Sequence, residues 1–153
     1  LTLVTARNTL SEKVFFHELG HGLAGPGDEY YTSSVSYENF YPAGVEPWEP
    51  NLTTLTRFET KWKDMVPGGR PVPTPREKPF ANSIGVFEGG GYTSRGVYSP
   101  FQDCRMKSNQ AEGFCPVCQR AITRMVTFLC DRADDPTTPG KDGSNGTEAP
   151  GRP

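Results

Sequence analysis

The chain has 153 residues, of which 17 are Gly and 15 are Pro. Together these fill about a fifth of the chain, against ~12% in an average protein, so turns and loops must be extensive. The formal net charge of -2 and the pI near 5.7 exclude a strongly basic protein, and we expect no nucleic-acid partner. No apolar run approaches the ~18 residues of a membrane span.

The first elements expected are a short strand over residues 1–6 and a helix that begins near Thr9. Alternating apolar and β-branched residues predict the strand. Thr9 and Glu12 have the spacing of a capping box. Apolar residues at helical spacing predict a face packed on a core, namely Leu10, Val14, Phe15 and Leu19. Pro26 ends the helix soon after Gly25, because it lacks an N–H and clashes with the preceding turn.

The expected helix carries both histidines of the chain, His17 and His21, in the pattern His-Glu-x-x-His. Helical residues four apart differ by about 400° of rotation and ~6 Å of rise, so both imidazoles leave one face. Zinc suits these ligands, and an open coordination position can hold a water whose pKa falls toward ~7. Glu18 can take the proton of that water and pass it to the leaving amine. The alternative is a pair of histidines that covers the edge of a core.

Two histidines need a third protein ligand, which must be a carboxylate or a Cys because no third His exists. Asp28 and Glu29 follow the Gly-Pro-Gly stop directly, and glycines at 25 and 27 allow the chain to turn back toward the metal. We predict Asp28 as the ligand, with Glu29 as its rival. Asp28 could instead cap a turn.

The middle of the chain is expected to be irregular. Eight prolines between residues 37 and 80 exclude a long helix and predict a covering loop that forms part of a substrate wall. One helical turn is expected near residues 58–65. Another irregular stretch begins at the glycine triplet 89–91. Tyr92 and Tyr98 follow this triplet, and either phenol could donate to an oxyanion that develops near the metal. Alternatively, both could be packing aromatics.

A second helix is predicted from Cys115-Pro116 to about Cys130, since Pro is favourable in a first helical turn. Residues 131–153 contain no aromatic or large aliphatic side chain, so they are predicted to be a disordered tail or linker. The folded domain is therefore expected over residues 1–130. The chain opens without Met, and we expect it to be the C-terminal part of a larger catalytic domain.

Several separated blocks of the sequence resemble the immunoglobulin A peptidase family of zinc metallopeptidases, a metzincin-like group. They follow in the expected order as HELGHGLAGPGDEY, EPWEPNLTT with KWKDMV, FEGGGYTSRGVYSPFQDCRMKSN and FCPVCQ. The resemblance spans residues 10 to 130 or so. The better-known metzincin pattern differs, because it has Gly at the position of Ala24 and its third ligand at that of Gly27.

The resemblance implies a role for each residue of the motif. His17, His21 and Asp28 would bind zinc. Glu18 would be the general acid/base. Met106 would be the Met-turn residue, forming an apolar floor beneath the metal. The resemblance also implies a secreted protein.

The four cysteines admit three interpretations. Disulfide bonds are favoured, because a loop-rich secreted domain with a thin core gains most from cross-links. A structural zinc would use all four thiolates, with Cys104 and Cys130 joining the pair Cys115 and Cys118. A redox pair is disfavoured, because such a pair usually begins a helix after a strand and no βαβ pattern is present.

Together these features predict an α+β, metzincin-like zincin catalytic domain that is loop-rich, has two main helices and lacks part of its N-terminal sheet. The predicted function is a zinc-dependent endopeptidase. The alternative is a catalytically idle zinc-binding or adhesion module derived from such a peptidase. The expected partner is a protein or peptide substrate, with immunoglobulin A as a candidate, and the protein is expected to be monomeric.

Overall fold

A computed structural model describes residues 8–31 and 40–133, and within these ranges the chain has an α+β fold. The helices are α1 (Ser11–Ala24) and α2 (Pro116–Ala133), and one antiparallel hairpin pairs β1 (Phe87–Gly90) with β2 (Thr93–Ser99). The strand predicted over residues 1–6 lies outside the described residues, as do residues 134–153 of the predicted tail. The first three residues of that tail, 131–133, are helical, which the prediction of a disordered tail over 131–153 did not anticipate.

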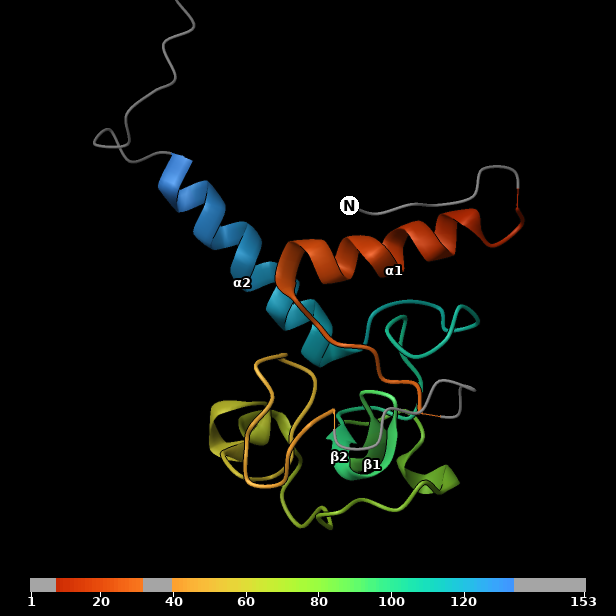
Figure 1. The fold of residues 1–153 in the computed structure, drawn as a ribbon, viewed down its shortest axis with the longest axis vertical. Coiled ribbons are helices and arrows are strands. Elements are labelled where there is room, and N and C mark those ends of the chain that lie inside the picture. Colours follow the sequence, from red (N-terminus) through yellow and green to blue (C-terminus); the bar gives the residue numbers. More distant parts are fainter. Residues whose placement is uncertain (1–7, 32–39, 134–153) are drawn as a thin grey trace, which may run out of the picture.

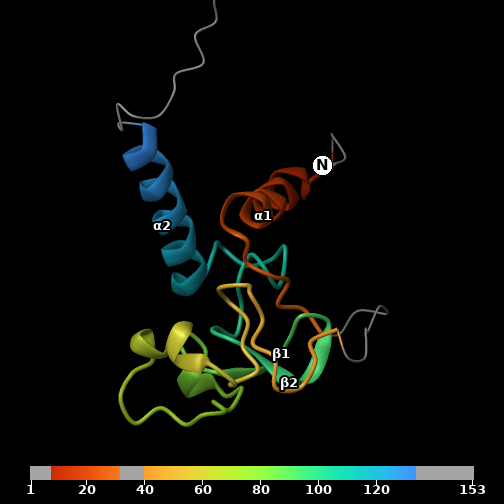
Figure 2. The ribbon, with the colours of Figure 1, turned by 60° about the vertical axis from the view of Figure 1, so that its left-hand side comes forward.

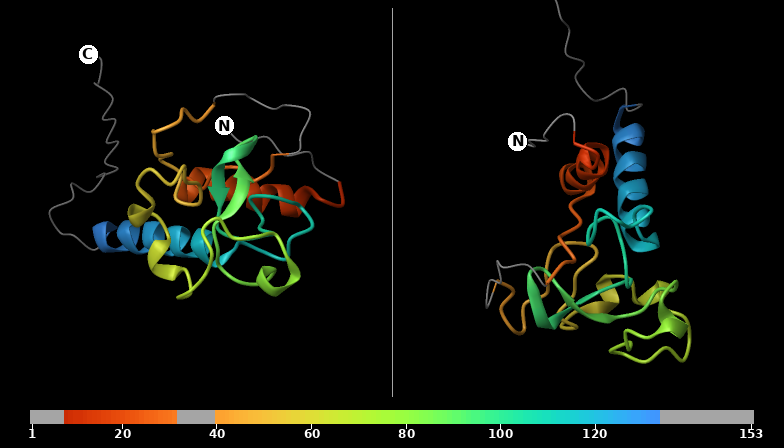
Figure 3. Two further views of the ribbon diagram at one scale, coloured as in Figure 1. Left: turned by 90° about the horizontal axis from the view of Figure 1, so that it is seen from below. Right: turned by 90° about the vertical axis from the view of Figure 1, so that its right-hand side faces the viewer.

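The two helices lie side by side at one end of the molecule, and the hairpin with the surrounding loops forms the other end (Figures 1 and 2). Residues 25–31 run from the end of α1 down to the hairpin (Figure 3). Two backbone hydrogen bonds fasten this segment to the turn of the hairpin, from Gly91 N to Asp28 O at 2.7 Å and from Tyr92 N to Tyr30 O at 3.0 Å. The segment 25–31 therefore joins the two ends.

The predicted capping box at the start of α1 is wrong. The helix begins at Ser11, and Leu10 at its N-cap makes no side-chain hydrogen bond to the first turn. Asn8 closes the entry instead, since its Oδ1 accepts from Leu10 N at 2.8 Å while its N–H donates to Ser11 Oγ at 3.0 Å. This Asn turn satisfies the N–H of Leu10, the N-cap residue, in place of the donors that a capping box would satisfy.

The end of α1 agrees with the prediction. Gly25 adopts φ of 69°, and its N–H donates to His21 O at 3.2 Å. A side chain here would be strained, and its Cβ would lie 2.5 Å from Trp48. Pro26 then directs the chain away from the helix.

The apolar face predicted for α1 does not pack on a core within the described residues. Phe15 and Leu19 are 50% and 44% exposed, and Gly20 is the helix's buried residue. The core lies below the helices, where the loops meet the start of α2. Its buried members are Phe58, Trp62, Val86, Cys104, Met106, Cys115, Val117 and Cys118.

The Pro-rich region forms no long helix over its described part, residues 40–80, as predicted. The expected helical turn is present as two 3-10 turns, Phe58–Thr60 and Lys63–Met65, and a third spans Lys78–Phe80. Trp62 anchors the first pair by donating from Nε1 to Gly85 O at 2.8 Å.

The stretch that begins at residues 89–91, predicted to be irregular, lies within the hairpin instead. Phe87 pairs with Ser99 and Glu88 with Tyr98, and a bulge follows before Gly90 pairs with Thr93. Gly89 has φ of 104°, which only Gly adopts readily, so the glycines that suggested a loop form the bulge and turn of a sheet. The Pro-rich loop extends this sheet by an isolated bridge from Thr53 to Tyr98.

Helix α2 starts at Pro116 as predicted and runs to Ala133, three residues past Cys130. Its first turn is buried through Val117 and Cys118, whereas Val126 and Leu129 are exposed. Neither of the helices in the described part of the chain has the length and apolar character needed to cross a membrane.

Candidate metal centre

Helix α1 and the segment 25–31 bring His17, His21 and Asp28 together. The Nε2 atoms of the two histidines are 3.1 Å apart. Asp28 Oδ1 lies 2.9 Å from Nε2 of His17 and 3.2 Å from Nε2 of His21. One ligand atom from each residue can therefore reach a common point, which is the arrangement needed for one metal ion.

Both imidazoles are oriented by backbone carbonyls. His17 Nδ1 lies 2.8 Å from Arg105 O, and His21 Nδ1 lies 2.7 Å from Pro26 O. A carbonyl oxygen only accepts, so each Nδ1 carries the hydrogen and each neutral ring presents an unshared electron pair at Nε2. A carbonyl partner on the second nitrogen is the usual way in which a protein fixes a metal-binding histidine.

Asp28 is held by its neighbours on the opposite carboxylate oxygen. Tyr92 donates to Oδ2 through a short hydrogen bond, and Tyr30 donates to the same atom at 3.1 Å. Oδ1 is buried and, among the described residues, faces only the two imidazole nitrogens. Two ring electron pairs and a carboxylate oxygen repel one another unless a cation lies between them, so the residues fit a divalent metal.

The pKa values of the three residues reflect the same need for positive charge. Burial alone would raise the pKa of Asp28, but without a metal ion the imidazoles can donate to it from Nε2 once they are protonated, and these bonds, with the one from Tyr92, hold it well below 3.8. The hydrogen bond to Asp28 raises the pKa of His21, and burial partly opposes this. Burial would lower the pKa of His17, but its bonds to Asp28 and the Arg105 carbonyl raise it overall. Burial and Asp28 also raise the pKa of Tyr92, so its phenol remains a donor.

Asn51 holds the segment that carries Asp28. Its Oδ1 accepts from Gly27 N at 2.7 Å, and its Nδ2 donates to Gly27 O at 2.9 Å and to Glu29 Oε1 at 2.8 Å. Asn51 is fully buried. Asn51 belongs to the predicted covering loop, so the described part of that loop holds the segment 25–31 in place.

Glu18 is half-buried and borders a hollow of about 210 Å³ beside His17. The hollow is shaped by α1 and by the loop that follows Met106, with lining residues Val14, His17, Glu18, Tyr30, Lys107, Ser108 and Asn109. Burial lowers the pKa of Lys107 to about 8. Glu18 therefore lies beside His17 at the edge of an open hollow.

Met106 is fully buried beneath α1. A Cβ placed on Gly20 would lie 3.1 Å from Met106 Sδ, so the thioether contacts the helix between the two histidines. The carbonyl of Met106 accepts from Glu29 N at 2.7 Å. The preceding residue, Arg105, supplies the carbonyl that orients His17. The backbone around Met106 therefore positions the site.

The structure separates the two rival carboxylates. Asp28 faces the histidines, whereas Glu29 is fully buried toward Cys118, with Sγ and Oε1 3.8 Å apart. Tyr92 contacts Asp28, as described above. Tyr98 packs beside the core, and its backbone pairs with Thr53.

The predicted disulfide bonds are not present, because all four cysteines are free. Cys104, Cys115 and Cys118 are buried together, and Cys130 is exposed farther along α2. Cys104 Sγ and Cys118 Sγ are 3.8 Å apart, too far for a bond of about 2.05 Å.

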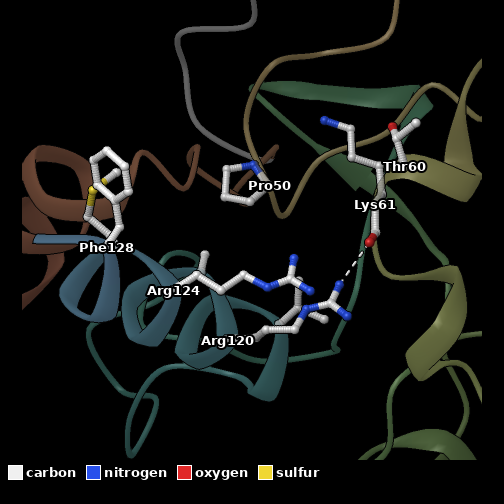
Figure 4. Close-up of a pocket in the computed structure, with 9 residues that line it drawn as sticks. Pro50, Thr60, Lys61, Arg120, Arg124 and Phe128 are labelled. Atoms are coloured by element: carbon white, nitrogen blue, oxygen red, sulfur yellow. Dashed lines mark hydrogen bonds between the residues drawn. The ribbon is translucent and has the colours of Figure 1, made fainter. Parts of the chain in front are cut away.

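A second pocket of about 240 Å³ lies between α2 and the first pair of 3-10 turns (Figure 4). Arg120 bridges its two sides, donating to Lys61 O at 2.8 Å and pairing with Asp64 at 2.6 Å. Arg124 and Lys61 line the same space. The pocket is a packing junction between elements and contains none of the predicted site residues.

Tyr30 and Asn51 contribute to the site but were not predicted from the sequence. The signal for Tyr30 was its position two residues after Asp28, because alternate residues of an extended segment point the same way. Asn51 gave no usable signal, since its partners lie 22 and 24 residues away.

The model of the family described as IgA Peptidase M64 matches residues 1–81 and 76–126 of the chain. No curated protein matches the chain.

Proposed function

The chain belongs to the IgA Peptidase M64 family, and from this membership and the geometry of the site we propose that it is a zinc-dependent endopeptidase. The family indicates a peptidase-related function and a protein substrate. His17, His21 and Asp28 would hold the zinc ion. The observation that carries the proposal is that both Nε2 electron pairs and Asp28 Oδ1 face one another within 3.2 Å.

In this proposal each residue has a separate task. A zinc ion bound there would lower the pKa of a water toward ~7 and polarise the carbonyl of the scissile peptide. Glu18 accepts the proton of the attacking water at its carboxylate and then donates it to the leaving amine. Tyr30 and Tyr92 hold the Asp28 carboxylate in place through Oδ2.

The hollow beside His17 and Glu18 is the proposed entry for the peptide substrate. Immunoglobulin A is the candidate substrate that the family name suggests, and secretion and a monomeric state belong to the same proposal. Lys107 on the wall of the hollow would favour an acidic or carbonyl group of the substrate.

The test compares Glu18→Gln with Glu12→Gln, an exposed residue in the first turn of the same helix. We expect Glu18→Gln to lower the rate of casein or immunoglobulin A cleavage about 10²- to 10⁴-fold, the usual contribution of a general acid/base. Glu12→Gln should cleave at the wild-type rate, and both variants should retain zinc.

Unchanged cleavage by Glu18→Gln would contradict the mechanism. Wild-type protein that binds zinc and cleaves neither substrate would instead favour the idle zinc-binding module.

A further inference from the structure

A second cluster of metal-ligating side chains lies within the core, and the peptidase mechanism does not use it. Three thiols and one carboxylate meet there, from Cys104, Cys115, Cys118 and Glu29. They come from three segments of the chain: the loop before Met106, the start of α2 and the segment 25–31. All four side chains are at most 3% exposed. Their ligand atoms lie within 4.8 Å of one another.

Two separations within the cluster are close to those of a tetrahedral metal site. Zinc binds thiolate sulfur at about 2.3 Å, so two sulfurs at a tetrahedral angle are about 3.8 Å apart. Cys104 Sγ and Cys118 Sγ are separated by 3.8 Å, and Cys118 Sγ lies 3.8 Å from Glu29 Oε1.

The carboxylate of Glu29 lacks a full set of protein partners. Oε1 accepts from Asn51 Nδ2 at 2.8 Å, but Oε2 is buried and meets no hydrogen-bond donor among the described residues. An unpaired buried carboxylate oxygen is costly unless a cation neutralises it. Cys115 N also donates to Cys104 Sγ at 3.2 Å, a backbone contact that stabilises a thiolate.

The sequence around α2 has the form of a metal-binding turn. Cys115-Pro-Val-Cys118 is a Cys-x-x-Cys pair at the start of a helix, which is a frequent spacing in zinc sites. The expectation of four thiolates is wrong in one ligand, because Cys130 is exposed on a later turn of α2 and Glu29 occupies the fourth position.

We propose that Glu29, Cys104, Cys115 and Cys118 bind a second, structural zinc ion. The two sites share no ligand, so this inference does not depend on the proposed peptidase activity. With four protein ligands and no exposed position, the second ion would have no place for a reacting water.

The second ion would position the first site through the backbone. Glu29 directly follows Asp28, and its N–H donates to Met106 O at 2.7 Å. Cys104 directly precedes Arg105, whose carbonyl orients His17. Fixing Glu29 and Cys104 on one ion therefore fixes the segment that carries Asp28 and the loop whose Arg105 carbonyl orients His17. These four residues are positioning residues and do not touch substrate.

The test uses a His17→Ala/His21→Ala double variant of the full chain, which removes two ligands of the first site and leaves the core cysteines intact. We expect two zinc ions per wild-type chain and one in the double variant. After replacement of zinc by cobalt, the double variant should show a thiolate-to-cobalt charge-transfer band. Cys130→Ala is the matched control and should keep both ions, whereas Cys118→Ser should lose one.

The inference is overturned if the double variant, dialysed with zinc, retains none, or if its cobalt form lacks the thiolate band. A disulfide between Cys104 and Cys118 found by intact mass after alkylation would also overturn it. The outcomes separate the two proposals. One thiolate-bound ion in the double variant with no cleavage by the wild type supports this site and contradicts the peptidase. Cleavage by the wild type with no metal in the double variant does the reverse.

Discussion

At the residue scale, the two carboxylate oxygens of Asp28 have different partners. Oδ1 faces the histidines, and Oδ2 accepts hydrogen bonds from Tyr30 and Tyr92. The phenols therefore fix the direction in which Oδ1 points. Residues that hold a ligand in this way commonly change metal affinity 10- to 100-fold when they are replaced.

Replacing Tyr92 tests this arrangement. Tyr92→Phe removes the hydroxyl that donates to Asp28 and keeps the ring that packs against Tyr30, with ring centroids 5.1 Å apart. We expect its zinc affinity, measured by competition with a chromogenic chelator, to fall about 10- to 100-fold. Tyr98→Phe is the control, because that ring packs beside the core, and it should bind zinc as the wild type does. Equal affinities in all three proteins would show that the phenol does not position Asp28.

The pair of histidines could be predicted from sequence, because the helix fixes the geometry of residues four apart. Asp28 was favoured over Glu29 as the third ligand, but sequence spacing could not decide between them. Adjacent residues in an extended segment point to opposite sides, and only the packing of Gly27 and Glu29 against Asn51 decides which carboxylate faces α1. The same alternation places the two acidic residues toward two different clusters.

At the scale of elements, α1 meets the rest of the molecule at Gly20. A Cβ at this position would lie 2.8 Å from the ring of Phe114 and 3.1 Å from Met106 Sδ. The absence of a side chain lets the helix approach the Met106 turn closely. Gly22, in the same helix, has open space at the position where a Cβ would lie.

These two glycines provide a matched comparison of stability. Alanine favours a helix over glycine by about 1 kcal/mol at either position, so Gly22→Ala should raise the free energy of unfolding by up to about that amount. At Gly20 overpacking should cost about 1–3 kcal/mol, leaving Gly20→Ala less stable than Gly22→Ala. Urea unfolding followed by circular dichroism measures the difference. Equal stabilisation by both substitutions would mean that α1 does not rest on Phe114 and Met106.

Elements with strong local signals were predicted correctly. Gly25 and Pro26 end α1, and Pro116 begins α2, because their backbone restrictions act within one turn. The hairpin was missed because its strands contain glycines whose positive φ angles serve a bulge, and pairing between strands is not a local property. The entry of α1 was predicted with the wrong residues, since Asn8 and Thr9 both have side chains suited to capping.

At the scale of the whole molecule, two segments connect the two clusters. The segment 25–31 contributes Asp28 to one cluster and Glu29 to the other, and the loop through Met106 contributes Cys104 and the carbonyl of Arg105. Helix α2 contributes the remaining thiols. The predicted disulfides failed at this scale, because sequence alone does not show that three cysteines and a carboxylate converge while Cys130 lies elsewhere.

The proposed peptidase activity requires that His17, His21 and Asp28 hold a zinc ion beside Glu18. The most direct measurement is anomalous diffraction at the zinc absorption edge from crystals of the protein. We expect a peak about 2.0–2.2 Å from His17 Nε2, His21 Nε2 and Asp28 Oδ1. Crystals grown with zinc that show no anomalous peak among these three atoms, whatever they show at the cysteines, would contradict it.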